Sequence, residues 1–249
     1  MLGTWINVGA VVAGTVSGRA LGGRLPAQTQ STVTSVLGCV TAILGIENAM
    51  TSPEVLKAAP LASRLGFFIV VLLSLLIGSL IGEGLDIEKG LHKLGQFAEK
   101  RFGASESDFG KGFVTASLLF CVGPLTILGS FKDGLQGDYS LLTTKAVLDG
   151  FAALAFSAAF GWGVLLSAVT VLVVQGALTL SAGAVQPLLT SVMVDAMTAA
   201  GGIMLLALGL RLLELKPIRV ANMLPALAMA PILVAVANMV HPGFFPSAH

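Results

Sequence analysis

Two aspartates, Asp149 and Asp195, lie inside stretches of sequence that are otherwise apolar. An ionisable side chain near the centre of a membrane costs at least ~2.5 kcal/mol on insertion scales, so such a residue suggests a functional site. A carboxylate in this position can bind a cation or a proton. The alternative is that each aspartate caps a helix that begins later than its apolar stretch, because Asp is favoured at helix N-termini.

Lys145 precedes Asp149 by four residues, which places both side chains on one face of a helix. The two charges are therefore expected to neutralise each other. Asn7, in the first apolar stretch, adds a polar group in the same outer part of the membrane. Together with Asp195, these residues are predicted to line one outward-facing vestibule.

Three uncharged polar residues lie deeper in apolar stretches: Thr126, Gln175 and Asn222. Gln175 either ties two helices together by hydrogen bonds or contacts a solute. Both interpretations remain open at the level of sequence.

Two apolar stretches contain residues that interrupt a helix. Gly123 and Pro124 fall near the middle of one, and Pro225 follows Asn222 in another. Interrupted membrane helices expose backbone groups, and in transporters such places mark binding sites. Ordinary proline kinks are the competing explanation.

No motif of a known catalytic or metal site is recognisable. His92, His241 and His249 lie outside the middle of the apolar stretches, and Cys39 and Cys121 lack the spacing of a zinc site or of a disulfide framework. The formal charge of +1 gives no basic surface for nucleic acid. We therefore expect no enzyme, no metal, no cofactor and no nucleic-acid partner.

The elements that position these residues are membrane helices. The chain has 55% hydrophobic and 11% charged residues, with a mean hydropathy of +0.91. A water-soluble domain carries about a quarter charged residues. The composition predicts a single all-α membrane domain over 1–249, with the lipid bilayer as its solvent.

Eight spans of suitable length are predicted. They cover residues 3–20, 32–50, 63–83, 112–131, 144–161, 163–182, 190–212 and 219–240. This count places ten of the fourteen Lys and Arg residues on one side, which the positive-inside rule assigns to the cytoplasm. Merging the fifth and sixth spans would instead give the two sides equal numbers of Lys and Arg residues. The eight-span arrangement therefore predicts that both termini lie outside the cytoplasm.

The longest polar segment, 84–111, is predicted to be a cytoplasmic connector with an amphipathic helix. Ile87, Leu91 and Leu94 recur near helical spacing, and Lys89 and Lys93 are on the other face. Such a helix can lie in the lipid headgroup layer or form a solvated connector packed on the bundle. The spacing does not decide between the two.

Small residues recur at the spacing that brings membrane helices together. Thr34, Gly38 and Gly45 in the second span are repeated at the same spacing by Thr198, Gly202 and Gly209 in the seventh. Helices five spans apart have opposite orientations, so spans 1–3 and 6–8 are predicted to form an inverted-topology repeat. The same glycine faces also permit a homo-oligomer.

Several short motifs occur in an order that resembles a bacterial membrane family. They are GTWIN at 3–7, FCVG at 120–123, ILG at 127–129, GLQGD at 134–138, KAVLD at 145–149, AGG at 200–202 with GL at 209–210, and NMLPA at 222–226. Over nearly its whole length the chain resembles the family called domain of unknown function 554. The resemblance implies a multi-pass protein of the bacterial cytoplasmic (inner) membrane, often labelled a possible transporter. It implies no substrate and no site residue.

The combined pattern favours a secondary transporter for a small solute or ion that works by alternating access. In this hypothesis Asp149 and Asp195 bind a cation or proton, Lys145 tunes Asp149, and the interrupted backbone contacts the solute. A channel is the second hypothesis, and a scaffold or sensor that acts through 84–111 is the third.

Overall fold

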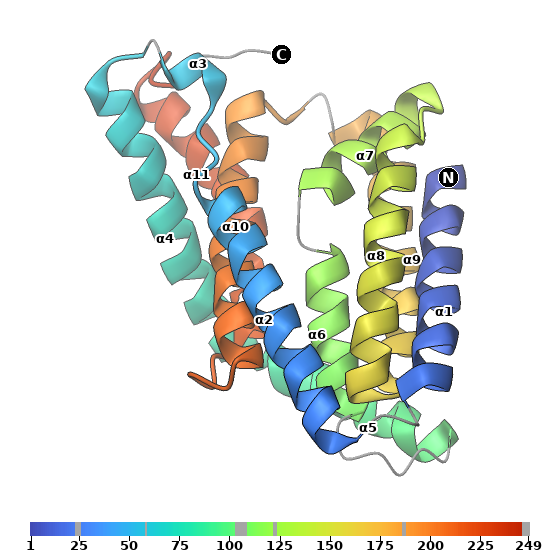
Figure 1. The fold of residues 1–249 in the computed structure, drawn as a ribbon. Helices are drawn as coiled ribbons and strands as arrows, with labels where there is room; N and C mark the ends of the chain where they lie inside the picture. The colour runs from blue at the N-terminus through green and yellow to red at the C-terminus, as the bar shows by residue number, and fades with distance from the viewer. Residues whose placement is uncertain (23–25, 58, 103–108, 122–123, 186–187, 246–249) are drawn as a thin grey trace.

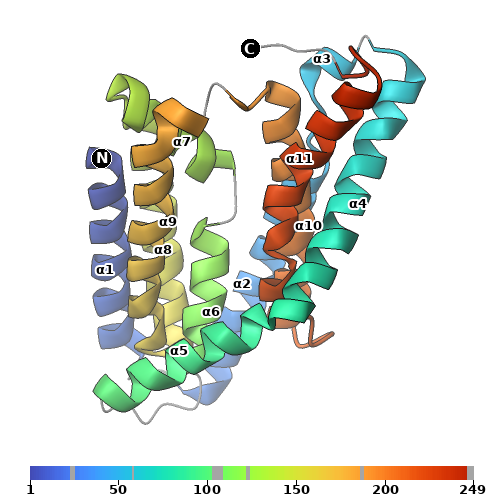
Figure 2. The same ribbon diagram turned by 180° about the vertical axis from the view of Figure 1, so that it is seen from behind.

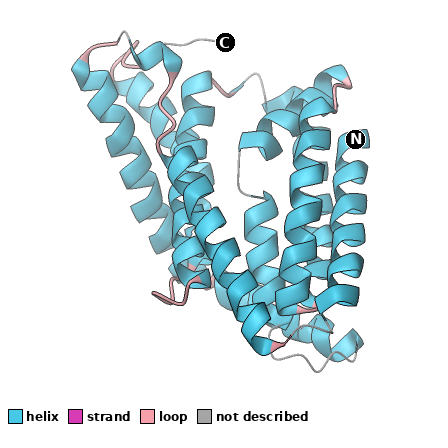
Figure 3. Cartoon of the chain, viewed as in Figure 1, coloured by secondary structure: helices cyan, strands magenta, loops and turns pink. Residues whose placement is uncertain are grey.

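The computed structural model describes residues 1–22, 26–57, 59–102, 109–121, 124–185 and 188–245, and within these residues its regular structure is entirely helical (Figures 1 and 3). The helices in chain order are α1 (Leu2–Gly22), α2 (Ala27–Ala49), α3 (Glu54–Lys57), α4 (Leu61–Leu85), α5 (Ile87–Phe102), α6 (Phe109–Cys121), α7 (Pro124–Gln136), α8 (Ser140–Phe160), α9 (Gly163–Val185), α10 (Ser191–Leu212), the 3-10 helix η2 (Val220–Met223) and α11 (Pro225–Val240). The all-α prediction is confirmed.

Six segments among the described residues are long and apolar enough to cross a membrane: α2, α4, α8, α9, α10, and η2 with α11. The predicted span 112–131 is two helices, α6 and α7, bent by 60° at a break; taken as one span they are the seventh candidate. α1 has 21 residues and is not among these candidates; it contains the polar residues Asn7 and Arg19. The count of eight spans therefore stays a prediction.

The long helices are arranged as two groups, which we name the α8 bundle (α1, α7, α8 and α9) and the α10 bundle (α2, α4, α10 and α11) (Figures 1 and 2). The start of α1 and the end of α11 lie at one end of the molecule (Figure 1). α5 and the connection between α10 and α11 lie at the opposite end (Figure 1). The ion pair between Arg211 and Glu88, 2.7 Å long, ties these two segments together.

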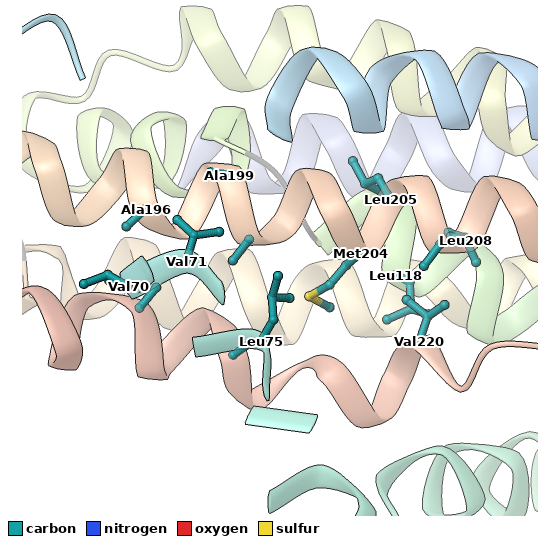
Figure 4. Packing of buried hydrophobic residues seen from close by; sticks show 14 of the residues in the cluster. Val70, Val71, Leu75, Leu118, Ala196, Ala199, Met204, Leu205, Leu208 and Val220 are labelled. Carbon is teal, nitrogen blue, oxygen red and sulfur yellow. The ribbon is translucent and has the colours of Figure 1, made fainter. Parts of the chain in front are cut away.

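The α10 bundle has a continuous apolar core around α10, the most deeply buried candidate span. Figure 4 shows Leu75 of α4 next to Met204 of α10, with Leu118 of α6 beside Leu208. α6 also places Ala116 and Phe120 in the core of the α8 bundle, so this helix is shared by both groups. The outward faces of the spans carry large exposed apolar side chains, as expected when lipid is the solvent.

The two repeated glycine motifs face each other across the contact between α2 and α10. A Cβ atom at Gly45 would meet the carbonyl oxygen of Gly202, and one at Gly209 would meet that of Gly38, each at 2.8 Å. Each motif thus contacts the other in a reciprocal manner, as a two-fold axis between them would require. The inverted repeat itself stays a prediction.

Candidate functional site

A buried ion pair lies between α1 and α8. Lys145 and Asp149 form it across one helical turn, and the side chains of both residues are buried. The amide nitrogen of Asn7 donates to Oδ2 of Asp149 at 2.9 Å. The structure therefore joins three of the predicted site residues in one polar cluster.

Glycines explain why Asn7 meets Asp149. A Cβ atom at Gly14 or Gly18 of α1 would clash with the backbone carbonyl oxygen of Gly150 or Leu154 of α8. α1 and α8 therefore approach until their backbones touch, which small residues alone allow. Asn7 lies two turns before Gly14 and is held against α8 by this contact.

Neither aspartate caps its helix, so the capping alternative is wrong for both. α8 begins at Ser140, nine residues before Asp149. α10 is capped by Thr190, whose hydroxyl accepts a hydrogen bond from the backbone N–H of Met193 at 3.3 Å. Asp149 is an interior residue of its helix and must be explained by its partners.

Further polar groups of α7 and α9 are buried in the same bundle. Thr126 donates to the backbone oxygen of Phe120 at 3.2 Å, which closes the break between α6 and α7. Asp133 accepts from the backbone N–H of Gly3 at 3.1 Å and thereby caps α1. Ser130 lies one turn before Asp133, is fully buried, and its hydroxyl has no hydrogen-bond partner.

Gln175 is fully buried in α9, and both polar atoms of its amide lack a partner. One turn further on, the hydroxyl of Thr179 lies 3.5 Å from that of Thr4 on α1. α1 and α9 run in opposite directions (Figure 1). Gln175 precedes Thr179 by one turn, and Asn7 follows Thr4 by one turn. Because the two helices are antiparallel, Gln175 and Asn7 therefore lie at about the same depth in the bundle.

Cys121, at the end of α6, lies near enough to Lys145 and Asp149 for both charges to act on its thiol. The neighbours of Cys121 in the chain are apolar, so the sequence alone does not indicate that it lies near the ion pair. Its position places the end of α6 beside the ion pair.

The structure separates Asp195 from this cluster. Asp195 is half-buried in α10, and its neighbouring charge is Glu54 of α3. Asp195 belongs to the α10 bundle, whereas Asp149 belongs to the α8 bundle. No contact in the described residues joins the two aspartates in the predicted single vestibule.

The structure places both predicted proline interruptions at the start of a helix. Pro124 is the first residue of α7 and Pro225 the first of α11, where proline is well tolerated because a first-turn N–H has no partner in the helix. Gly123 lies outside the described residues. Asp138, between α7 and α8, is partly exposed, and the hydrogen bond that it accepts from Ser140 lowers its pKa.

Asn222 belongs to a second polar cluster at the opposite end of the molecule. Its side-chain oxygen accepts from the backbone N–H of Glu88 at 2.7 Å. Glu88 in turn accepts from Arg211 at 2.7 Å and from the backbone N–H of Ala221 at 3.2 Å. The sequence analysis missed Glu88 and Arg211 because both lie at the polar ends of their helices.

A cavity of about 350 Å³ lies between the two bundles, next to α7. Its lining is entirely apolar: Ile127, Phe131, Leu178, Val185, Leu189, Met197, Leu224, Leu227, Ala228 and Pro231. Ile127 and Phe131 point into it, whereas Thr126 and Ser130, their neighbours in the chain, are buried polar residues. α7 thus separates an apolar space from the polar cluster.

These features define a multi-pass helical membrane protein with a buried ion pair and unpaired polar groups inside one of its two bundles. The chain belongs to the family described as "Protein of unknown function (DUF554)", whose model matches residues 2–235. This confirms the family that the sequence motifs indicated.

Two relatives cover nearly all of the chain. The "Uncharacterized membrane protein YdfK" of Bacillus subtilis (strain 168) is 31% identical over 238 residues, which are 96% of this chain and 97% of that protein. The "Uncharacterized protein YqgA" of Escherichia coli (strain K12) is 34% identical over 235 residues, which are 92% of this chain and 94% of that protein. No solved structure matches the chain.

Proposed function

We propose that the protein is a secondary transporter that binds a small polar solute or ion at the cluster of Asn7, Lys145 and Asp149. The observation that supports this most is that polar groups are buried in the membrane domain without full pairing. Asn7 Oδ1, Ser130 Oγ and both amide atoms of Gln175 lack hydrogen-bond partners. Unpaired polar groups in an apolar medium are costly, and a polar solute would satisfy them.

The ion pair gives this site one charged group of each sign. Lys145 and Asp149 neutralise each other, so the empty site carries no net charge. A solute group of either sign, or a proton, can take the place of one partner and leave the other satisfied. Asn7 holds the carboxylate in place, because its amide nitrogen donates to Asp149, and its own side-chain oxygen is left without a partner.

Alternating access requires that the two bundles move relative to each other. The cavity between them is lined by apolar side chains, so no hydrogen bond across it resists such a movement. α6 contributes to both cores and is the element about which the bundles would rearrange.

Transport can be tested with purified protein in proteoliposomes on a solid-supported membrane. Concentration steps of H⁺, Na⁺, K⁺, chloride, amino acids and neutral sugars are the probes. At least one probe should give a transient current in the wild type, and Asp149→Asn should reduce that current at least about tenfold, as expected when about 1.4 kcal/mol or more of binding or barrier energy is lost.

Asp195→Asn is the matched control, because Asp195 is half-buried and lies in the other bundle. It should leave the current within about twofold of the wild-type value. An Asp149→Asn variant that is folded and transports like the wild type would remove the cluster from the mechanism. Unitary currents in a planar bilayer would instead indicate a channel.

A further inference from the structure

α5 is fixed to the protein along one face. Glu88, near its start, binds Arg211 of α10 and the backbone N–H of Ala221, and is only 7% exposed. One turn later, Leu91 packs against the core of the α10 bundle, and His92 lies 3.8 Å from Glu88. These contacts determine which side of α5 faces outward.

The outward side carries Lys89, Lys93 and Phe97, spaced one turn apart. The Lys89 side chain is 65% exposed and Phe97 is 69% exposed. Asp86, which ends α4 in a left-handed conformation, pairs with Lys89 at 3.3 Å. Lys93 has no ion-pair partner in the part of the chain that the structure describes.

We propose that this face of α5 binds the headgroups of anionic phospholipids. α5 lies across the end of the molecule where α4 and α10 end, which is the level of a headgroup layer (Figures 1 and 2). An exposed aromatic ring one turn from a lysine is unfavourable in water, but it is favoured where a helix lies in a membrane interface.

The charge of the outward face of α5 determines which kind of lipid it binds. α5 contains the basic residues Lys89, Lys93, Lys100 and Arg101 and the acidic residues Glu88 and Glu99. Glu88 faces inward and is neutralised by Arg211. On the outward side, Lys89 and Lys93 carry two positive charges against the one negative charge of Asp86, and this positive balance complements the negative surface of a leaflet that contains anionic lipid.

Hydrogen–deuterium exchange of the full-length protein in nanodiscs tests the proposal. One set of discs contains neutral phosphatidylcholine alone and the other contains about a third phosphatidylglycerol. Amides of 87–102 should exchange about three- to tenfold more slowly in the anionic discs, because docking suppresses local opening of α5. Amides of 191–212, in the core of the α10 bundle, should exchange equally in both and serve as the internal reference.

Lys89→Glu with Lys93→Glu should abolish the difference between the two lipids, and about 0.5 M salt should shrink it in the wild type. Lys132→Glu, an exposed lysine on α7 at the other end of the molecule, is the matched control and should preserve it. Phe97→Ala should speed exchange in both lipids while the effect of charge remains. Equal exchange of 87–102 in the two lipids would overturn the proposal and leave α5 as a surface for solvent or a protein partner, and so would a difference that survives the double substitution.

Discussion

At the scale of single residues, the partners of Asp149 explain its position better than its own chemistry does. The sequence predicted its pairing with Lys145, because a four-residue spacing inside a helix leaves little choice. It did not predict the hydrogen bond from Asn7, which is 142 residues away in the chain. Contacts between distant segments depend on how the helices pack, and a single sequence does not specify that packing.

Removing only one member of the ion pair should be more harmful than removing both. Asp149→Leu leaves the buried Lys145 without its partner and should lower the free energy of unfolding by about 3–5 kcal/mol. Lys145→Met with Asp149→Leu should restore most of that loss, because two apolar side chains of similar volume need no pairing. Thermal unfolding in detergent measures both variants, and the double variant should still fail in the transport assay. A double variant as unstable as the single one would refute the assigned role of the pair.

Gln175→Leu separates the two roles left open for this residue. If Gln175 serves a solute, the substitution removes two unpaired buried atoms and should leave stability unchanged or raise it by about 1–3 kcal/mol. Transport should fall at the same time. A loss of stability by a similar amount would show instead that Gln175 ties helices together.

At the scale of elements, glycine spacing was the most informative signal for packing. Gly14 and Gly18 are one turn apart in α1, at the spacing that brings membrane helices together, and the structure presses both against the backbone of α8. Span 112–131 was harder to interpret, because an apolar run that contains proline can be one kinked helix or two. The 60° bend between α6 and α7 decides for two helices.

Two glycines of α1 offer a matched pair of substitutions. A Cβ atom at Gly18 would overlap the backbone of Leu154, so Gly18→Ala should cost about 1–3 kcal/mol of stability. A Cβ atom at Gly9 has nothing within 4 Å, so Gly9→Ala should be neutral or slightly stabilising through helix propensity. Unfolding of both variants in detergent provides the comparison, and equal effects would mean that α1 and α8 are not in backbone contact.

At the scale of the whole molecule, composition sufficed to predict a membrane helix bundle, and charge distribution suggested which connections share a side. The structure places α5 and the α10–α11 connection at the same end, joined by Arg211 and Glu88. The position of a residue along its span, however, does not indicate which of the two bundles contains that span. Asp149 and Asp195 were therefore predicted to share a vestibule, although they belong to different bundles.

Single cysteines can test this arrangement in a background without Cys39 and Cys121. Gln96→Cys and Leu215→Cys should react with a membrane-impermeant maleimide from the same side of the membrane, because both lie at the end formed by α5. Met50→Cys and Lys132→Cys should react from the other side. Labelling of Gln96→Cys and Leu215→Cys from opposite sides would contradict the fold.

The contact between α1 and α8 also bears on how the protein is made. At common rates of synthesis, on the order of 10 s pass between the emergence of Asn7 and that of Asp149 from the ribosome. Throughout this interval the first helix has been translated while the carboxylate that pairs with its amide does not yet exist. The insertion machinery or the intervening helices must therefore keep the polar side chains of α1 away from lipid during this interval. A ribosome that stalls before α8 would leave a nascent chain in which these side chains face lipid.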